Sequence, residues 1–281
     1  VDKSGLQLPY IDRVLVNISS AGLIPAKAGA GETDLQARYL RLDNYPFLME
    51  GGERNGFNVH LWKRGVGSQM ALYPNLNSVD PVWRALVRDI RFRRALSLAV
   101  DREEINQVIY FGLVSASANT VLPESPLFRE DYQQAWSEFD LDTANALLDE
   151  IGLTERDTDG LRLMSDGRAL EIVIQTAGES TEQSDLLELI HDTWLQIGIK
   201  IHTKPSQREV FRERVYSGEA MMAVWHGYDN GLPTADTPPN EFVPMRQDQL
   251  QWPGWGQHHE TSGLTGEAPD LAPAKRLLEL A

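Results

Sequence analysis

The chain has 281 residues, of which 42% are hydrophobic and 24% are charged, a composition typical of a globular protein with a sizeable core. Its 41 acidic residues outnumber its 26 basic residues, and the net charge of −15 repels phosphate backbones, so we expect no nucleic-acid partner. The absence of cysteine excludes disulfides, thiol catalysis and thiolate metal sites.

The first quarter of the sequence mixes extended and helical patterns. Residues 10–18 (YIDRVLVNI) predict a strand, and residues 34–48 predict a helix that is interrupted near Pro46. In residues 57–62 (FNVHLW) apolar and polar side chains alternate, as they do in a half-buried strand. Residues 70–77 predict a further strand.

The middle of the sequence is predicted to be mainly helical. Two short helices cover residues 80–100, and the capping pair Asp101 and Glu104 opens a third. Residues 121–136 contain two prolines and predict a loop. A fourth helix begins with a cap at Asp140.

Three extended runs alternate with two amphipathic helices in the part of the chain that carries the strongest pattern. The runs are residues 170–176, 199–204 and 220–226. Two polar pairs predict the helix N-termini, Ser180 with Gln183 and Ser206 with Glu209. The short connections of this β-α-β-α-β order imply parallel strands with right-handed crossovers.

The carboxyl ends of parallel strands meet at one edge of a sheet, and open α/β folds bind their ligands there. In this chain the edge is predicted at residues 176–180, 204–208 and 225–230. Six side chains near it can stack, donate or accept, and we identify them as candidate ligand-binding residues: Trp225, His226, Tyr228, Asp229, Asn230 and Arg208.

These side chains suit a small solute. Trp225 and Tyr228 offer rings that stack on a sugar ring or on an apolar side chain. Asp229 suits an ammonium group or sugar hydroxyls, and Arg208 suits a carboxylate. The alternative interpretations are a core aromatic at Trp225, an Asx turn at Asp229 and a solvated cation at Arg208.

The segment 229–270 is rich in proline, glutamine and tryptophan and shows little periodicity, so we expect a long loop. Its Trp252 and Trp255 either form a ligand wall or pin the loop to the body of the protein. Pinning is favoured, because compact surface loops are packed by their own side chains. His258 and His259 are adjacent and lack a further ligand set, so we predict no metal and no cofactor.

Several segments, in this order, resemble one family, the extracellular solute-binding proteins of family 5. Residues 8–14 (LPYIDRV) resemble the family segment that precedes the second lobe. Residues 91–112 (RFRRALSLAVDREEINQVIYFG) are similar to the hallmark segment of the family. Residues 139–153 and 186–228 resemble the helices and strands that follow it, up to a strand that ends in tryptophan.

The resemblance implies an α/β fold, a lobe of the type II periplasmic-binding-protein class with a mixed sheet flanked by helices. Members of the family have two lobes that enclose the ligand, and this sequence matches the second lobe and its flanks. The chain is then incomplete relative to the family, with a segment from the lobe boundary in residues 1–55 and the second-lobe domain in residues 56–281. We expect weak binding by this part alone, because half of the cleft is absent.

The resemblance also implies a non-catalytic subunit of a bacterial ABC importer. Such a protein captures a solute in the cleft, here a peptide, a sugar or an opine-like compound, and delivers it to the permease in the membrane. The implied state is a monomer in the periplasm or attached to the outer side of the cytoplasmic membrane. Two alternatives come from other classes: a carboxylate-dependent hydrolase that acts near Asp229, and a protein-interaction module that uses the Trp-rich loop.

The sequence departs from the family at one position of the site. In peptide-binding members the strand ends in tryptophan, and an aspartate three positions later pairs with the α-ammonium group of the peptide. Trp225 matches that tryptophan, but Tyr228 takes the position of the aspartate and the acid follows at Asp229. We therefore expect either a peptide or an oligosaccharide or another polyhydroxylated compound as the ligand.

Overall fold

A computed structural model describes residues 1–178 and 181–281 of the chain. The predicted cap at Ser180 lies outside the described residues. Contacts between residues divide the chain into two units, Val1–Trp62 and Lys63–Ala281. The lobe boundary that the family resemblance implies after residue 55 remains a prediction.

The smaller unit contains two α-helices and two 3-10 turns. These are η1 (Ala21–Leu23), α1 (Ile24–Gly29), η2 (Leu42–Asn44) and α2 (Tyr45–Asn55). The two α-helices approach closely, because a Cβ atom on Gly51 would lie only 2.5 Å from the carbonyl oxygen of Gly29. The helix predicted over residues 34–48 was placed too early, since α2 starts where Pro46 can occupy its first turn.

Both strands predicted in this unit are wrong. Residues 10–18 and 57–62 form no strand within the part of the chain that the structure describes. The apolar side chains of the first segment lie in solvent, with 82% of Val16 and 98% of Ile18 exposed. A strand persists only where a neighbour satisfies its backbone groups and covers its apolar face, so an extended pattern alone was insufficient here.

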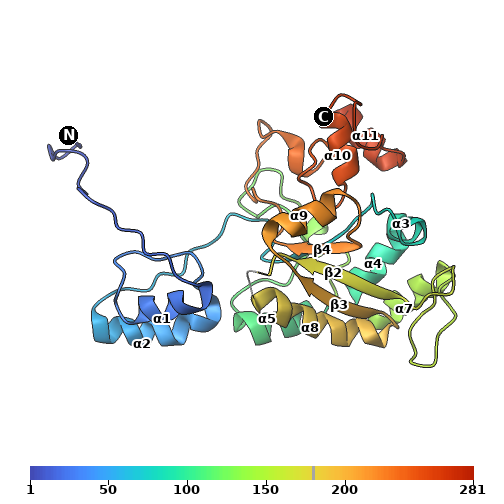
Figure 1. Ribbon diagram of the computed structural model, residues 1–281, viewed down its shortest axis with the longest axis horizontal. Helices are drawn as coiled ribbons and strands as arrows, with labels where there is room; N and C mark the ends of the chain where they lie inside the picture. Colours follow the sequence, from blue (N-terminus) through green and yellow to red (C-terminus); the bar gives the residue numbers. More distant parts are fainter. Residues whose placement is uncertain (179–180) are drawn as a thin grey trace. The chain divides into compact units, whose positions relative to one another are not determined.

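The larger unit is an α/β structure built on one four-stranded sheet (Figure 1). Its strands are β1 (Ala71–Pro74), β2 (Glu171–Thr176), β3 (Lys200–Pro205) and β4 (Met222–Trp225). Its helices are α3 (Pro81–Arg88), α4 (Ile90–Leu98), α5 (Arg102–Tyr110), α6 (Glu130–Gln134), α7 (Leu141–Glu150), α8 (Thr181–Gln196), α9 (Arg208–Tyr216), η3 (Pro239–Glu241), α10 (Pro253–Glu260) and α11 (Ala272–Leu280).

The sheet is mixed, with the strand order β1-β4-β2-β3. Strand β2 pairs in parallel with both β3 and β4, whereas β1 runs antiparallel to β4 and places Ala71 opposite Trp225. Ile174 and Gln175 of the inner strand β2 point to opposite faces of the sheet and are both buried, as a strand covered on both faces requires. The predicted β-α-β-α-β unit and its parallel strands are confirmed.

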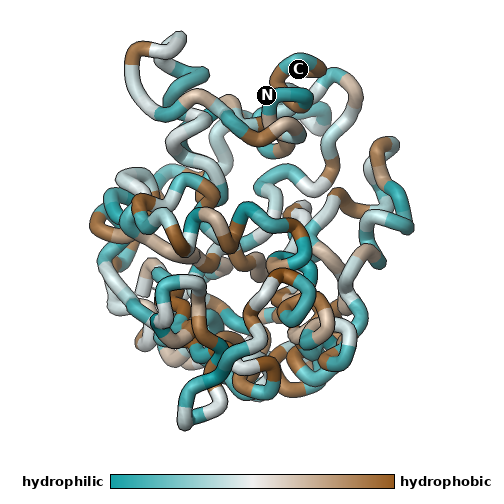
Figure 2. The backbone as a smooth tube through the Cα atoms, turned by 90° about the vertical axis from the view of Figure 1, so that its right-hand side faces the viewer, coloured by the Kyte–Doolittle hydropathy of each residue, from teal (hydrophilic) through white to brown (hydrophobic). Residues whose placement is uncertain are grey.

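The two crossover helices lie on opposite sides of the sheet. Figure 1 shows α9 above the strands and α8 below them. Phe211 and Val215 of α9 pack against Ala223 of β4, and Trp194 of α8 donates from its indole to the Leu96 carbonyl of α4 at 3.2 Å. Along the tube in Figure 2 apolar and polar stretches alternate, as expected for elements with one buried side.

Two of the predicted helix caps are confirmed, and one is wrong. Asp101 and Asp140 accept backbone N–H groups of the first turns of α5 and α7. Asp80, which was not among the predicted caps, accepts N–H groups of the first turn of α3 in the same way. At α9 the N-cap is Gln207, which makes no side-chain bond to the helix. The hydroxyl of Ser206 is buried and finds no hydrogen-bond partner among the described residues, so the predicted pair with Glu209 does not form.

The predicted loop of residues 229–270 contains regular structure that the sequence did not indicate. Helix α10 begins within the sequence Pro-Gly-Trp-Gly, which favours helix poorly. The side chain of Asn77 stabilises its first turn from 177 positions away, by accepting the backbone N–H groups of Gly254 and Trp255 at 3.0 and 3.3 Å. The helix therefore depends on a tertiary cap that no local pattern reveals.

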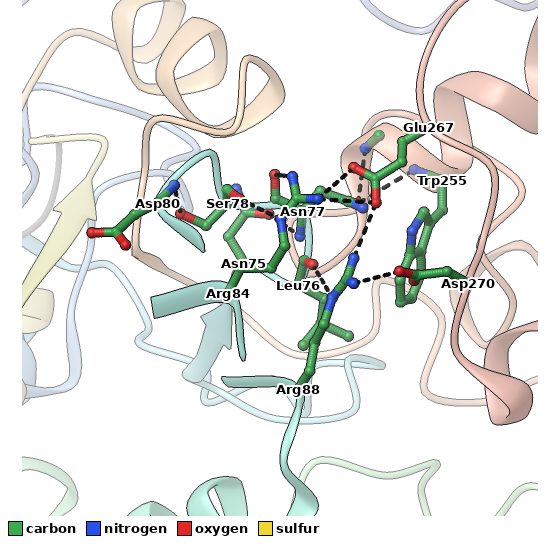
Figure 3. Close-up of polar contacts among 11 residues, drawn as sticks. Asn75, Leu76, Asn77, Ser78, Asp80, Arg84, Arg88, Trp255, Glu267 and Asp270 are labelled. Atoms are coloured by element: carbon green, nitrogen blue, oxygen red, sulfur yellow. Dashed lines mark hydrogen bonds and ion pairs between the residues drawn. The ribbon is translucent and has the colours of Figure 1, made fainter. Parts of the chain in front are cut away.

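Residues 253–270, which we call the C-terminal strap, are fixed to α3 by two arginines (Figure 3). Arg84 and Arg88 both contact Glu267 at 3.1 Å, and Arg88 also contacts Asp270 at 2.7 Å. Trp255 is 1% exposed, with the guanidinium of Arg88 5.2 Å from its ring centre. These contacts agree with the prediction that Trp255 pins the segment to the body.

Candidate functional site

The three parallel strands end at one edge of the sheet, as predicted. Strands β2, β3 and β4 end at Thr176, Pro205 and Trp225. The chain turns from β3 into α9 at this edge, which brings Arg208, the first residue of α9, next to the end of β4. The edge therefore collects side chains from two elements that are separate in the sequence.

Trp225 is half-buried at this edge and is held by contacts on its ring. The ring of Phe211, from α9, stacks on it with a centre-to-centre distance of 5.9 Å and an interplanar angle of 25°. The guanidinium of Arg208 lies 5.3 Å from the same ring centre, and the imidazole of His226 lies 5.3 Å away in a tilted contact. An oriented aromatic ring that stays partly open to solvent is suited to stacking on a ligand.

The backbone that follows Trp225 is held by hydrogen bonds to two other segments. We call residues 226–231 the site loop. The N–H groups of Gly227 and Gly231 donate to the carbonyls of Ser68 and Gly65 at 2.9 and 2.7 Å, and these bonds extend the antiparallel pairing of β1 and β4 past the end of the strands. In addition, the Asn119 side chain accepts the N–H of Tyr228 at 3.2 Å.

The two glycines of the site loop are required by this close packing. A Cβ atom on Gly227 would lie 2.2 Å from the Asn119 side-chain oxygen and 2.5 Å from the backbone nitrogen of Ser68. A Cβ atom on Gly231 would lie 2.9 Å from both the Leu122 side chain and the Val66 carbonyl carbon. Only glycine fits where backbone segments approach this closely.

Tyr228 is half-buried, and its ring packs on that of Phe242 with the ring centres 4.7 Å apart. Burial, reinforced by the nearby charge of Glu241, raises the pKa of the Tyr228 hydroxyl. The hydroxyl of Tyr73, on β1, donates to the carbonyl of His226 at 2.7 Å, and burial also raises its pKa. Both phenols therefore stay neutral, and the Tyr73 hydroxyl holds the backbone of the site loop at His226.

Asp229 and Asn230, in contrast, present their side chains to solvent. The Asp229 side chain is 80% exposed, and its carboxylate lies 3.3 Å from Nδ1 of His226. The Asn230 side chain accepts the N–H of Leu232 at 3.0 Å, so the Asx turn forms at Asn230 and not at Asp229. The carboxylate of Glu241 accepts the backbone N–H groups of both residues, at 2.5 and 3.1 Å.

The structure thus brings the predicted residues together at one edge and adds supporting groups that the sequence did not indicate. Tyr73, Asn119 and Glu241 hold the backbone of the site loop from three separate segments. No local pattern links such positions, because each contact depends on tertiary packing.

Among the described residues no group of three His, Asp or Glu side chains is placed to hold a metal ion. Within the same residues, every helix is too short or too polar to cross a membrane.

Comparisons with known proteins match this chain to solute-binding proteins. The profile of the bacterial extracellular solute-binding proteins, family 5 (middle part), matches residues 4–249. A probable ABC transporter-binding protein of Deinococcus radiodurans is 24% identical over 208 residues, which cover 72% of this chain and 34% of the relative. The chain therefore spans about a third of the length of this curated relative.

Solved structures place the fold in the same group. An oligopeptide-binding protein, OppA, matches with a TM-score of 0.67 and 28% identity, over 94% of this chain and 44% of the other. A periplasmic binding protein of Agrobacterium fabrum, in complex with stachyose, matches with a TM-score of 0.73 and 17% identity, over 94% of this chain and 40% of the other. The chain belongs to the bacterial extracellular solute-binding proteins of family 5.

Proposed function

We propose that this chain is the second-lobe part of the solute-binding component of an ABC importer. It holds a small solute at the carboxyl edge of β2, β3 and β4, in the periplasm or on the outer side of the cytoplasmic membrane, and the solute passes from it to a membrane permease. Lobe closure over such a site excludes water and strengthens polar contacts to the solute.

One observation carries the proposal. The site loop has its backbone fixed by its neighbours, whereas the side chains of Asp229 and Asn230 project into solvent beside the half-buried ring of Trp225. A stacking surface next to hydrogen-bonding groups on a fixed backbone is the combination that recognises a ring with hydroxyl groups or a peptide.

We propose an oligosaccharide as the preferred solute and a peptide as the second candidate. Tyr228, at the position of the family's ammonium-binding aspartate, is packed on Phe242 and has no charge to offer. The carboxylate of Asp229 lies beside the imidazole of His226, an arrangement that suits hydroxyl donors. The stachyose complex of one structural relative provides the probe for this preference.

We propose a binding role and not catalysis for Asp229. The chain belongs to a family of solute-binding proteins, and this supports a binding role for the exposed carboxylate. The hydrolase hypothesis would be restored by turnover of a glycoside or peptide substrate that the Asp229→Asn variant has lost.

The test is a titration of the 281-residue chain with stachyose and, separately, with penta-alanine, followed by 1H–15N spectroscopy. We expect stachyose to shift the indole signal of Trp225 and the amide signals of Asp229 and Asn230, with a dissociation constant in the millimolar range. Trp225→Phe should weaken this binding, and the matched control Trp252→Phe, in a half-buried tryptophan outside the site, should leave it unchanged.

Two results would contradict the proposal. The first is an absence of shifts with both probes at the solubility limit. The second is a set of shifts that leaves Trp225 and Asp229 unaffected and maps elsewhere in the larger unit. Shifts with penta-alanine alone would retain the site and reverse the preferred solute.

A further inference from the structure

Glu241 is placed to control the conformation of the site loop. It ends the short turn η3, and its two carboxylate oxygens accept separate backbone N–H groups, one from Asp229 and one from Asn230. These are the two residues whose side chains face solvent at the site. The next residue, Phe242, packs on Tyr228. Residues 241 and 242 therefore fix three consecutive residues of the site loop.

The two hydrogen bonds need an ionised carboxylate. An ionised carboxylate is an acceptor only, and it serves two N–H donors at once. A protonated carboxyl places a donor on one of its oxygens, and that oxygen can no longer accept an N–H in the same geometry. The backbone of residues 229 and 230 then loses one of its two bonds to Glu241.

Titratable groups from the site loop and from β1 face Glu241. The carboxylate of Asp229 and the imidazole of His226 come from the site loop. The phenols of Tyr73, from β1, and Tyr228 also face it. Both phenols stay neutral across the acidic range, so neither contributes a change of charge near Glu241 on acidification.

We propose that Glu241 is a positioning residue, whose ionised carboxylate fixes Asp229 and Asn230 for solute binding and whose protonation lowers the affinity for solute. The inference rests on the proposed function, because it assigns a control to the same site. It adds a residue that does not touch the solute and a dependence on pH that the solute-binding role alone does not require.

The sign of the pH effect follows from the surroundings of Glu241. Burial raises the pKa of its carboxyl above the ordinary value, against the opposing effect of the two N–H bonds from Asn230 and Asp229. The ionised form is therefore less favourable in the folded chain than in the unfolded chain, and this cost disappears as the pH falls through the raised pKa. As far as Glu241 is concerned, mild acid weakens solute binding without weakening the fold.

The first experiment needs no solute. In 1H–15N spectra recorded from neutral to acidic pH, the amide signals of Asp229 and Asn230 should shift together, with a common midpoint above the ordinary glutamate pKa of about 4.3. The common step should be absent in Glu241→Gln. It should persist in the matched control Asp236→Asn, which changes an exposed acid of the same segment. Different midpoints for the two amides, or an unchanged step in Glu241→Gln, would overturn the inference.

The second experiment measures stachyose affinity by the same spectra at neutral and at acidic pH. Across the amide step the wild-type chain should lose about tenfold in affinity, which corresponds to ~1.4 kcal/mol. Glu241→Gln should bind weakly at both pH values, with little dependence on pH, and Asp236→Asn should follow the wild type. A thermal unfolding curve of each variant at neutral pH shows whether it is folded.

The outcomes separate this inference from the function on which it rests. Binding of stachyose with the same affinity at both pH values, or equal affinity in Glu241→Gln and wild type, would overturn the role of Glu241 and leave the solute-binding proposal intact. An intact amide step without binding of stachyose or penta-alanine at any pH would overturn the proposed function, and with it the effect on affinity.

Discussion

Trp225 and Trp255 contact arginine side chains in nearly the same way, but they lie in very different surroundings. The guanidinium of Arg208 is 5.3 Å from the ring centre of Trp225, and that of Arg88 is 5.2 Å from the ring centre of Trp255. Trp255, in the C-terminal strap, is 1% exposed. Trp225, which ends β4 just before the site loop, is only half-buried. An arginine beside an indole is thus not by itself the mark of a binding site.

The difference between the two regions lies in what their side chains do once the backbone is fixed. In the strap, Asn77 binds the backbone around Trp255, and the buried ring lies against the guanidinium of Arg88 of α3. In the site loop, Ser68 and Glu241 are among the groups that bind the backbone, but Asp229 is left in solvent. A fixed backbone whose side chains are buried stabilises the fold. A fixed backbone whose side chains are exposed to solvent preorganises a binding site.

The largest effect on stability is expected from Trp255→Ala. Removal of a fully buried tryptophan leaves a cavity, and the free energy of unfolding should fall by about 3–5 kcal/mol. The measurement is urea denaturation monitored by circular dichroism. The control Trp252→Ala removes a half-buried ring of the neighbouring turn and should cost clearly less. Equal losses for the two variants would show that Trp255 is not the anchor of the strap.

Arg88→Ala should have the next largest effect. Arg88 donates to the Leu76 carbonyl at 2.8 Å and to Glu267 at 3.1 Å, and its side chain is only 13% exposed. We expect a loss of about 2 kcal/mol in the free energy of unfolding, because charged hydrogen bonds that are largely shielded from water are broken. The control Asp270→Asn should cost less than about 0.5 kcal/mol, since that carboxylate is more than half exposed. A reversed order would contradict the proposed division of roles in the strap.

Gly227→Ala tests whether the backbone of the site loop is as closely packed as that of the strap. The added methyl group meets the backbone nitrogen of Ser68 at 2.5 Å, and we expect destabilisation of about 1–2 kcal/mol in urea denaturation. Gly65→Ala, on the segment that pairs with the loop, is the matched control, because its nearest neighbour is the Leu232 side chain at 4.0 Å. If both variants had the stability of the wild type, the site loop would be more loosely held than the structure indicates.

Asp229→Asn should have the smallest effect on stability and a clear effect on binding. The side chain is 80% exposed, so the free energy of unfolding should change by less than about 0.5 kcal/mol. Stachyose affinity should fall by about three- to tenfold, because hydrogen bonds to a charged acceptor are lost. Retention of full affinity for both stachyose and penta-alanine would remove Asp229 from the site.

The β-α-β-α-β unit, the helix caps of α5 and α7 and the edge that carries the candidate site were predictable, because each follows from local pattern and connection length. The glycines of the site loop also carried a signal, since a glycine next to an aromatic strand end suggests close backbone approach. What each side chain does at the edge was not predictable. Tyr228 and Asp229 are adjacent and both polar, yet the first is half-buried against Phe242 and the second is exposed to solvent.

The features that sequence reasoning missed all depend on distant partners. Helix α10 is capped by Asn77, and the site loop is fixed by Glu241, which lies beyond a proline-rich turn. Residues 10–18 have a strand pattern, but no strand forms there among the described residues. In each case the local sequence favours one secondary structure, and the presence or absence of a tertiary contact decides whether that structure forms.

The bonds between α3 and the C-terminal strap have a consequence for the order of folding. Arg84 and Glu267 are 183 positions apart in the sequence, and Arg88 and Asp270 are 182 positions apart. Chain synthesis proceeds from the N-terminus, so α3 leaves the ribosome long before its partners exist. Until the strap emerges, Arg88 lacks its contacts with Glu267 and with the ring of Trp255. Helix α3, the first helix of the larger unit to be synthesised, is therefore among the last to complete its contacts. The delay is set by the time that is needed to synthesise the chain between α3 and the strap.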